Sequence, residues 1–189
     1  MLKVVISGGP GTGKTSLIET LQNQGYDCSP EIIRLLTDEL KKNTHPQDQQ
    51  TNPLVFSEDP LQFNTLLLEG RSAQFHDAGR TTSPLHFFDR SVIDVLAYMD
   101  YFDQQYPESF VAAANDLRYD QVFLLPPWKD IYVQDNERME SFEEAVKIHE
   151  SLLASYREYN YSPFLVPFGT LEERMDFVLR NLFTQKNKK

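Results

Sequence analysis

Eight residues near the start of the chain have the types and spacing of a phosphate-binding loop. They read Gly-Gly-Pro-Gly-Thr-Gly-Lys-Thr over 8–15, which fits the pattern G-x-x-x-x-G-K-[S/T]. Glycines let backbone N–H groups turn inward around a phosphate, and the N-terminus of a following helix adds partial positive charge. Lys14 is expected to reach the β- and γ-phosphates, and the Thr15 hydroxyl is expected to ligate Mg²⁺.

The residues on either side of this loop have the pattern that the loop requires. The apolar run 2–7 predicts a buried strand, and 14–23 predicts a helix that ends near Gly25. A plain glycine-rich turn is the alternative, but a chance match in a strand–loop–helix context is rare. The residues expected to contact ATP are Gly8, Gly9, Pro10, Gly11, Thr12, Gly13, Lys14, Thr15 and Ser16.

An acidic residue, Asp89, follows the apolar run 85–88, which predicts a strand. A carboxylate at the end of a strand beside the phosphate loop is suited to hold Mg²⁺, usually through water, so Asp89 joins Thr15 as an expected metal ligand. Arg90 is expected to pair with a carboxylate or a substrate phosphate. The alternatives are that Asp89 caps the helix that follows and that Arg90 is a surface arginine.

Glu31 follows a short strand expected at 26–30 and opens a helix expected at 31–36. Ligands of open parallel sheets bind beyond the carboxyl ends of the strands. Glu31 is therefore placed to accept a proton from an attacking hydroxyl. A first-turn glutamate that stabilises the helix dipole explains the same residue equally well.

Three further groups of residues are weaker candidates. Arg138 lies in the polar segment 126–140, interpreted as a lid, where it would stabilise charge during transfer; a surface ion pair is the alternative. Gly169, in the segment 167–170, is expected to wrap adenine through backbone contacts, unless the segment is a simple turn. Ser91, Asp94 and Tyr98 share one helix face, which either lines a substrate pocket or faces solvent.

Strand and helix patterns alternate along the chain, which predicts an α/β fold with a five-stranded, mostly parallel sheet, helices on both faces and a short lid. The remaining strands are expected at 121–125 and 164–167. Without a repeat or a linker, residues 1–189 form one expected domain, with a variable substrate segment at about 37–80 and a polar loop at 43–57. The other expected helices are 58–78, 91–104, 107–118, 141–159 and one that starts at Thr170.

Composition limits the possible partners. The chain has 189 residues and a formal net charge of −10, so a nucleic-acid backbone is not expected as the main partner. Cys28 is the only cysteine, which fits a reducing compartment. Because no run of about 18 apolar residues is present and the first strand starts at once, neither a membrane span nor a signal peptide is expected, and the cytoplasm is the expected compartment.

The order of these motifs resembles the small AAA-domain P-loop ATPases related to the ribosylnicotinamide kinase module, within the nucleoside and nucleotide kinase-like P-loop NTPases. The resemblance runs from residue 2 to about 183 and includes Phe88-Asp89-Arg90-Ser91 and the pattern over 166–177. It implies a base role for Glu31, and roles in metal and phosphate binding for Asp89 and Arg90. Residues 37–60 match no pattern of this group, so the acceptor stays open.

Three functions are compatible with these residues. The first is a kinase that transfers the ATP γ-phosphoryl to a hydroxyl or phosphate of a small molecule, and the alternative is a stand-alone ATPase that acts as a partner-binding switch. A binding module without catalysis fits the intact Lys14, Thr15 and Asp89 least well. The chain has no Asn-Lys-x-Asp guanine signature, and Asp-Arg rather than Asp-Glu at 89–90 argues against an oligomeric motor. The oligomeric state is left open.

Overall fold

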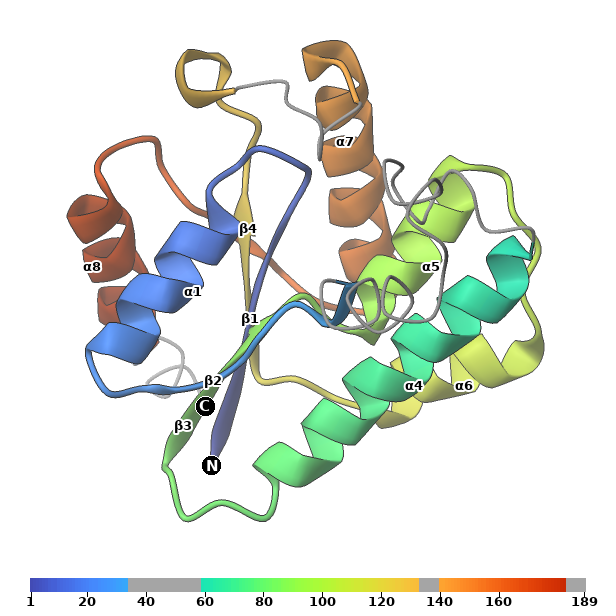
Figure 1. The fold of residues 1–189 in the computed structure, drawn as a ribbon, viewed down its shortest axis with the longest axis horizontal. Helices are drawn as coiled ribbons and strands as arrows, with labels where there is room; N and C mark the ends of the chain where they lie inside the picture. Colours follow the sequence, from blue (N-terminus) through green and yellow to red (C-terminus); the bar gives the residue numbers. More distant parts are fainter. Residues whose placement is uncertain (34–58, 133–139, 183–189) are drawn as a thin grey trace, which may run out of the picture.

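The computed structural model describes residues 1–33, 59–132 and 140–182. A parallel sheet of five strands in the order β2-β3-β1-β4-β5 forms its centre (Figure 1), and the predicted α/β class is confirmed. The strands are β1 (Leu2–Gly8), β2 (Asp27–Ser29), β3 (Leu85–Asp89), β4 (Gln121–Leu125) and β5 (Phe164–Leu165).

The register of the central strands places the candidate site residues together, at the carboxyl ends of the strands. Ile6 of β1 pairs with Asp89 of β3 and with Phe123 of β4. Strands buried on both faces read as continuous apolar runs, which is why Val4, Val5 and Ile6 follow one another in β1. The carboxyl ends of β1 and β3 are therefore neighbours, and the phosphate loop begins beside Asp89.

Helices cover both faces of the sheet (Figure 1). On one face, Leu17 of α1 (Lys14–Asn23) and Val178 of α8 (Leu171–Asn181) share a core cluster with Ile6 and Phe123. On the other face, the cluster around Phe88 contains residues of the other α-helices whose bounds lie within the described residues. These are α4 (Pro60–Ala78), α5 (Val92–Tyr101), α6 (Glu108–Asp116) and α7 (Phe142–Glu158).

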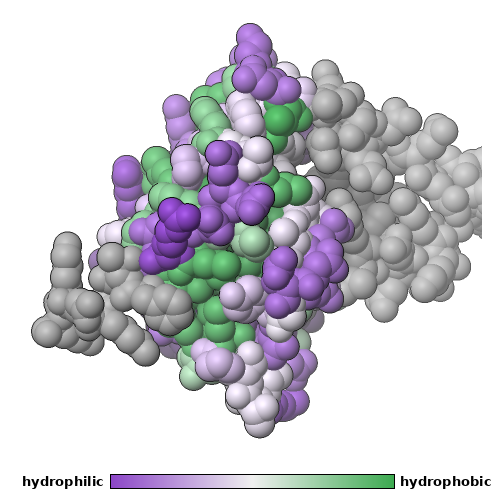
Figure 2. Space-filling view, turned by 90° about the vertical axis from the view of Figure 1, so that its left-hand side faces the viewer, coloured by the Kyte–Doolittle hydropathy of each residue, from purple (hydrophilic) through white to green (hydrophobic). Residues whose placement is uncertain are grey.

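The side of the molecule that carries α8 mixes hydrophilic and hydrophobic residues on its surface (Figure 2). Leu171 of this helix is 40% exposed, while its charged neighbours Glu172 and Glu173 are also at the surface. No helix within the described ranges is long and apolar enough to cross a membrane.

Local signals set the helix boundaries. Capping boxes begin two of the helices, because Ser141 and Thr170 each exchange hydrogen bonds with the glutamate three residues on. The helix expected at 91–104 is shorter, Val92–Tyr101, because the chain turns at Phe102 and Asp103 takes a positive φ of 52°.

Several expected elements differ at their ends. The strand expected at 26–30 spans Asp27–Ser29, and the strand expected at 164–167 spans Phe164–Leu165, since Pro167 has no N–H to donate. Within the expected lid, a 3-10 helix, η2, spans Lys129–Ile131. Of the helix expected at 31–36, Ile32 and Ile33 are helical and Glu31 precedes them without helical structure. Residues 34–36 and the loop at 43–57 lie outside the described residues.

Candidate active site

The phosphate loop connects β1 to α1 in a conformation that leaves backbone donors free. Gly11 and Gly13 have φ angles of 68° and 80°, in the left-handed region that favours glycine. Gly13 is the N-cap of α1, and because glycine has no side chain, it makes no capping hydrogen bond to the N–H groups of the first turn. The N–H groups of that turn and the positive end of the helix dipole are thus available to an anion.

Lys14 is folded back onto the loop. Its Nζ donates to the Gly9 carbonyl oxygen at 2.6 Å, and the side chain is only 7% exposed. Burial, together with the positive charge of Arg90, lowers the pKa of Lys14 to about 7, although nearby carboxylates oppose this shift. A phosphate bound in the loop would supply negative charge that favours the ammonium form.

Asp89 ends β3 as a buried carboxylate. It is 2% exposed, and its Oδ1 has no hydrogen-bond partner among the described residues. Burial, and then the charge of Glu31, raise the pKa of Asp89 to about 6. A buried carboxylate oxygen without a partner is costly, so this residue fits a magnesium ion or one of its water ligands. Thr15, half-buried in the first turn of α1, offers the hydroxyl ligand that such a site also needs.

The alternative explanation for Asp89, a helix cap, is not what the structure contains. Ser91 is the N-cap of α5, and Asp94 completes its capping box. The role of Asp89 as a metal ligand therefore stays a prediction, supported by its burial and its unpartnered oxygen.

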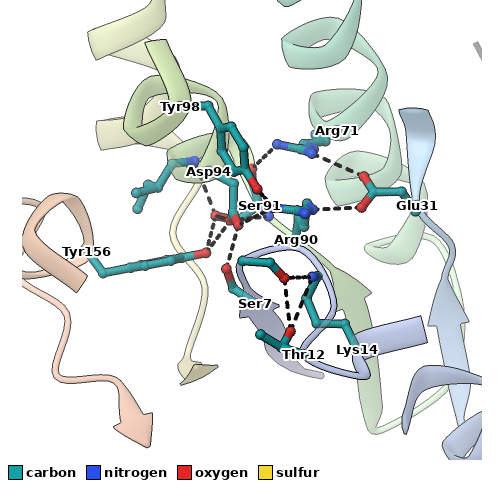
Figure 3. Close-up of polar contacts among 12 residues, drawn as sticks. Ser7, Thr12, Lys14, Glu31, Arg71, Arg90, Ser91, Asp94, Tyr98 and Tyr156 are labelled. Carbon is teal, nitrogen blue, oxygen red and sulfur yellow. Dashed lines mark hydrogen bonds and ion pairs between the residues drawn. The ribbon is translucent and has the colours of Figure 1, made fainter. Parts of the chain in front are cut away.

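Glu31 contacts two guanidinium groups, one on each carboxylate oxygen (Figure 3). Arg90 Nε donates to its Oε2 at 2.7 Å, and Arg71 Nη2 donates to its Oε1 at 3.2 Å. Burial raises the pKa of Glu31, but the charges of Arg90, Arg71 and Lys14 outweigh burial and hold the pKa below its usual range. Glu31 is thus an ionised carboxylate that two arginines hold in place. Stabilisation of a helix dipole, the alternative considered above, does not account for these two ion pairs.

Arg90 is not a surface arginine. The residue is 8% exposed and adopts a positive φ of 73°, which is uncommon outside glycine. Its Nη1 donates to the Tyr98 hydroxyl at 3.3 Å and lies 3.7 Å from Asp94 Oδ1. The strained turn after β3 aims the guanidinium back over the edge of the sheet, toward Glu31.

Asp94 joins the strand before the phosphate loop to two helices. It accepts hydrogen bonds from Ser7 Oγ of β1 and from the Tyr156 hydroxyl of α7, each at 2.5 Å, and from the Ser91 backbone N–H at 2.9 Å (Figure 3). Asp94 and Ser91 are both 0% exposed, so of the two alternatives for this helix face, the one in which it faces solvent does not hold. The network fixes α5 against β1 and α7.

A cavity of about 150 Å³ lies over this network. Its polar lining includes the side chains of Arg71, Arg90, Asp94 and Tyr98, and Pro10 of the phosphate loop also lines it. The apolar part of the wall is formed by Ile33, Leu67 and Val95. The cavity is therefore contiguous with the phosphate loop and has both polar and apolar walls, as small-molecule sites do.

The segment expected to contact adenine lies on the other side of the loop. Gly169 adopts a φ of 153°, and Thr170 caps α8. Phe168 is 55% exposed and stacks on Trp128, with ring centroids 5.2 Å apart. A role for this segment in holding a base stays a prediction.

Some residues of the site were not predicted from the sequence, and one predicted residue is not among the described residues. Arg71, Tyr156 and Trp128 were not expected, although Arg71 follows Phe63 and Leu67 at four-residue spacing, and a charged residue at an apolar position of a helix is a usable signal. Arg138 lies in the part of the expected lid, 133–139, that is outside the described residues.

Comparisons with solved structures show the fold. Deoxyadenosine kinase from M. mycoides superimposes with a TM-score of 0.66 at 16% identity, over 96% of this chain and 98% of that chain. Thymidylate kinase from Candida albicans gives 0.65 at 15% identity, over 100% of this chain and 93% of that chain. The NadR protein in complex with NR gives 0.66 at 18% identity, over 95% of this chain and 51% of that chain.

No curated protein matches the chain. A family model described as an AAA domain matches residues 3–174, which include the phosphate loop, Glu31, Asp89 and Arg90. Because this match spans most of the 189 residues, the expected family is confirmed: the chain belongs to the AAA-domain family.

Proposed function

We propose that the protein is an ATP-dependent kinase that transfers the γ-phosphoryl group to a hydroxyl of a small molecule. The observation that carries this proposal is the cavity that the phosphate loop shares with Arg90, Arg71 and Asp94. An acceptor in this cavity would lie beside the phosphates, which is the proximity that transfer requires. The kinase folds named above support the same conclusion by analogy.

Each part of the site has a role in this reaction. The loop N–H groups and Lys14 hold the phosphates, and Thr15 and Asp89 would hold Mg²⁺, which neutralises charge on the β- and γ-phosphates. The acceptor oxygen forms a bond to the γ-phosphorus, the bond from that phosphorus to the bridging oxygen breaks, and ADP leaves. The hydroxyl proton passes to Glu31, which Arg90 and Arg71 hold in place.

The charges of the cavity favour a neutral acceptor. Within the described part of its wall, Arg71 and Arg90 both pair with Glu31, and Arg90 also lies near Asp94. A phosphomonoester would need cations that are not already shared with carboxylates. An uncharged molecule with a hydroxyl, such as a nucleoside, fits the polar and apolar walls without breaking these pairs.

Other expectations remain proposals of the same kind. We infer one domain over 1–189, a lid at about 126–140 that brings Arg138 to the phosphates, an adenine loop at 167–170 that includes Gly169, and a cytoplasmic enzyme that does not bind nucleic acid. The net charge of −10 and the single cysteine support the last two points.

A ligand screen tests the function. Nucleosides and related ribosides are added to the protein with Mg²⁺ and a non-hydrolysable ATP analogue, and the melting temperature is followed. A ligand at about 100 times its Kd adds roughly 2.7 kcal/mol of stability. Each hit is then incubated with Mg-ATP, and the product is weighed by mass spectrometry.

A phosphorylated acceptor formed together with ADP is the expected result. If every candidate leaves ADP release unchanged and none gains a phosphoryl group, the kinase assignment is wrong and the ATPase switch replaces it.

A further inference from the structure

Arg174, in the first turns of α8, contacts the phosphate loop from behind. Its Nη1 donates to the Thr12 carbonyl oxygen at 3.1 Å, and its Nη2 donates to the Gly13 carbonyl oxygen at 3.2 Å. The helices α8 and α1 lie on the same face of the sheet (Figure 1), and Arg174 is only 5% exposed. A residue near the end of the chain therefore holds the loop near its start.

The fit between this arginine and the loop is close. Gly13 has a φ of 80°, and a Cβ atom at this position would lie 2.5 Å from Arg174 Nη2. Glycine is thus required here for two reasons, the left-handed backbone and the approach of the guanidinium.

The two carbonyl groups belong to the peptides that carry the Gly13 and Lys14 N–H groups, which are donors that a phosphate-binding loop offers to its ligand. In a planar trans peptide the C=O and N–H point in opposite directions, so the Thr12 carbonyl fixes the Gly13 N–H and the Gly13 carbonyl fixes the Lys14 N–H. A cation on both carbonyl oxygens also polarises these peptides and makes their N–H groups better donors.

Within the described part of the chain, the charge of Arg174 has no local counter-ion. The guanidinium makes no ion pair with any described carboxylate, and its Nε has no hydrogen-bond partner among the described residues. Burial lowers the pKa of Arg174, but an arginine remains charged in proteins. A buried, uncompensated cation is costly, and the triphosphate across the loop would offset that cost.

From these contacts we infer that Arg174 is a positioning residue for phosphate binding, a role that rests on the proposed binding of ATP. It holds the Gly13 and Lys14 N–H groups toward the phosphates and adds positive charge behind them. A merely structural contact, which ties α8 to α1, would change stability without changing affinity for phosphates.

The test measures the binding of Mg-ATP and of Mg-tripolyphosphate by calorimetry. Tripolyphosphate has no base, so it reports on the loop without the 167–170 segment. Arg174→Met keeps the length of the side chain but removes the charge and the donors, and Arg174→Lys keeps the charge. Arg180→Met is the matched control, because Arg180 lies on the same helix, pairs with Asp176 and is 79% exposed.

Arg174→Met should weaken both ligands about tenfold, equivalent to about 1.4 kcal/mol. Arg174→Lys should fall between this variant and the wild type, and Arg180→Met should bind as the wild type does. If Arg174→Met does not fold, a loss of tripolyphosphate affinity in Arg174→Lys supports the inference.

Wild-type affinity for tripolyphosphate in a folded Arg174 variant overturns the inference, even if the melting temperature falls. A wild-type protein that binds neither ligand overturns the proposed function together with this inference, so the two failures are distinguishable.

Discussion

The phosphate loop and the acceptor cavity lie at the same edge of the sheet, but they are built from different parts of the chain. The loop is a single segment whose backbone provides the donors, with Gly11 and Gly13 in left-handed conformations. The cavity is built from side chains of several elements, among them Arg71 of α4, Arg90 after β3 and Tyr98 of α5.

This difference separates what is general in the site from what is specific. Backbone donors recognise any phosphate of the right geometry, so the loop fits many nucleoside triphosphates. The cavity depends on buried ion pairs such as Arg90 with Glu31, and buried polar groups that must all be satisfied are selective for one arrangement of partners. We therefore expect changes in the loop to affect every phosphate ligand, and changes in the cavity to affect the acceptor alone.

The phosphate loop and the expected metal ligands form what we call the phosphate side of the site. On this side, the largest effect is expected for Lys14→Ala. Loss of the charge that reaches the phosphates should lower turnover by about 10²–10³-fold, and calorimetry should show weaker Mg-ATP binding. Lys147→Ala, an exposed lysine on α7, is the matched control. Equal ATP affinity for the wild type and Lys14→Ala would contradict the assignment of Lys14 to phosphate binding.

Arg138→Ala tests whether the lid belongs to the phosphate side. An arginine that closes over the transferred group acts on charge in the transition state, so kcat should fall by about 10²-fold while ATP affinity changes little. Steady-state kinetics and calorimetry measure the two quantities separately. An unchanged kcat would assign Arg138 to a surface ion pair.

The cavity and the residues that line it form what we call the acceptor side of the site. On this side, Arg71→Met should weaken acceptor binding without changing the binding of Mg-ATP. Glu31 loses one of its two partners but keeps Arg90, so the free energy of unfolding should fall by about 1–3 kcal/mol. The KM for the acceptor should rise, with Mg-ATP affinity unchanged. Arg80→Met, at a position whose side chain is 81% exposed, should leave the free energy of unfolding and the KM for the acceptor unchanged. Weaker ATP binding in Arg71→Met would show that the two sides are not separable.

The sequence predicted the two sides to different extents, for a physical reason. The loop, the strand before it and the helix after it are contiguous, so a local motif identifies all three, and Asp89 is found from the end of its strand. The ion pair of Arg71 with Glu31 joins residues 40 positions apart, and only the packing of α4 against the sheet brings them together. The sequence left open whether Asp94 is buried, because its polar side chain lies on a helix face whose partners come from β1 and α7.

A smaller effect is expected away from both regions, at His86 on β3. Its Nε2 lies 2.8 Å from Ser29 Oγ, and burial lowers the pKa of His86 below its ordinary value of 6.5, with Lys3 adding to this and Asp27 opposing it. The unfolded chain then binds a proton at higher pH than the folded protein. The contribution of His86 to the free energy of unfolding is therefore fully present above pH 6.5, and it is lost as the pH falls below this value.

Urea unfolding at neutral and acidic pH measures this dependence. His86→Gln should flatten the loss of stability toward acidic pH, and His76→Gln, at an exposed position, should not. An unchanged slope in His86→Gln would assign the acid sensitivity to other groups, such as His149, whose pKa burial also lowers.

The most direct test of the account is the rate of phosphoryl transfer in Glu31→Gln, measured as ADP release with and without the acceptor found in the screen. Glutamine keeps the shape of the side chain but cannot accept the proton, so transfer should fall by about 10²–10⁴-fold while Mg-ATP affinity and slow background hydrolysis persist. Asp89→Asn, on the metal side, should lower both activities. Transfer at the wild-type rate in Glu31→Gln would contradict the assignment of the base and, with it, the separation of the site into a phosphate side and an acceptor side.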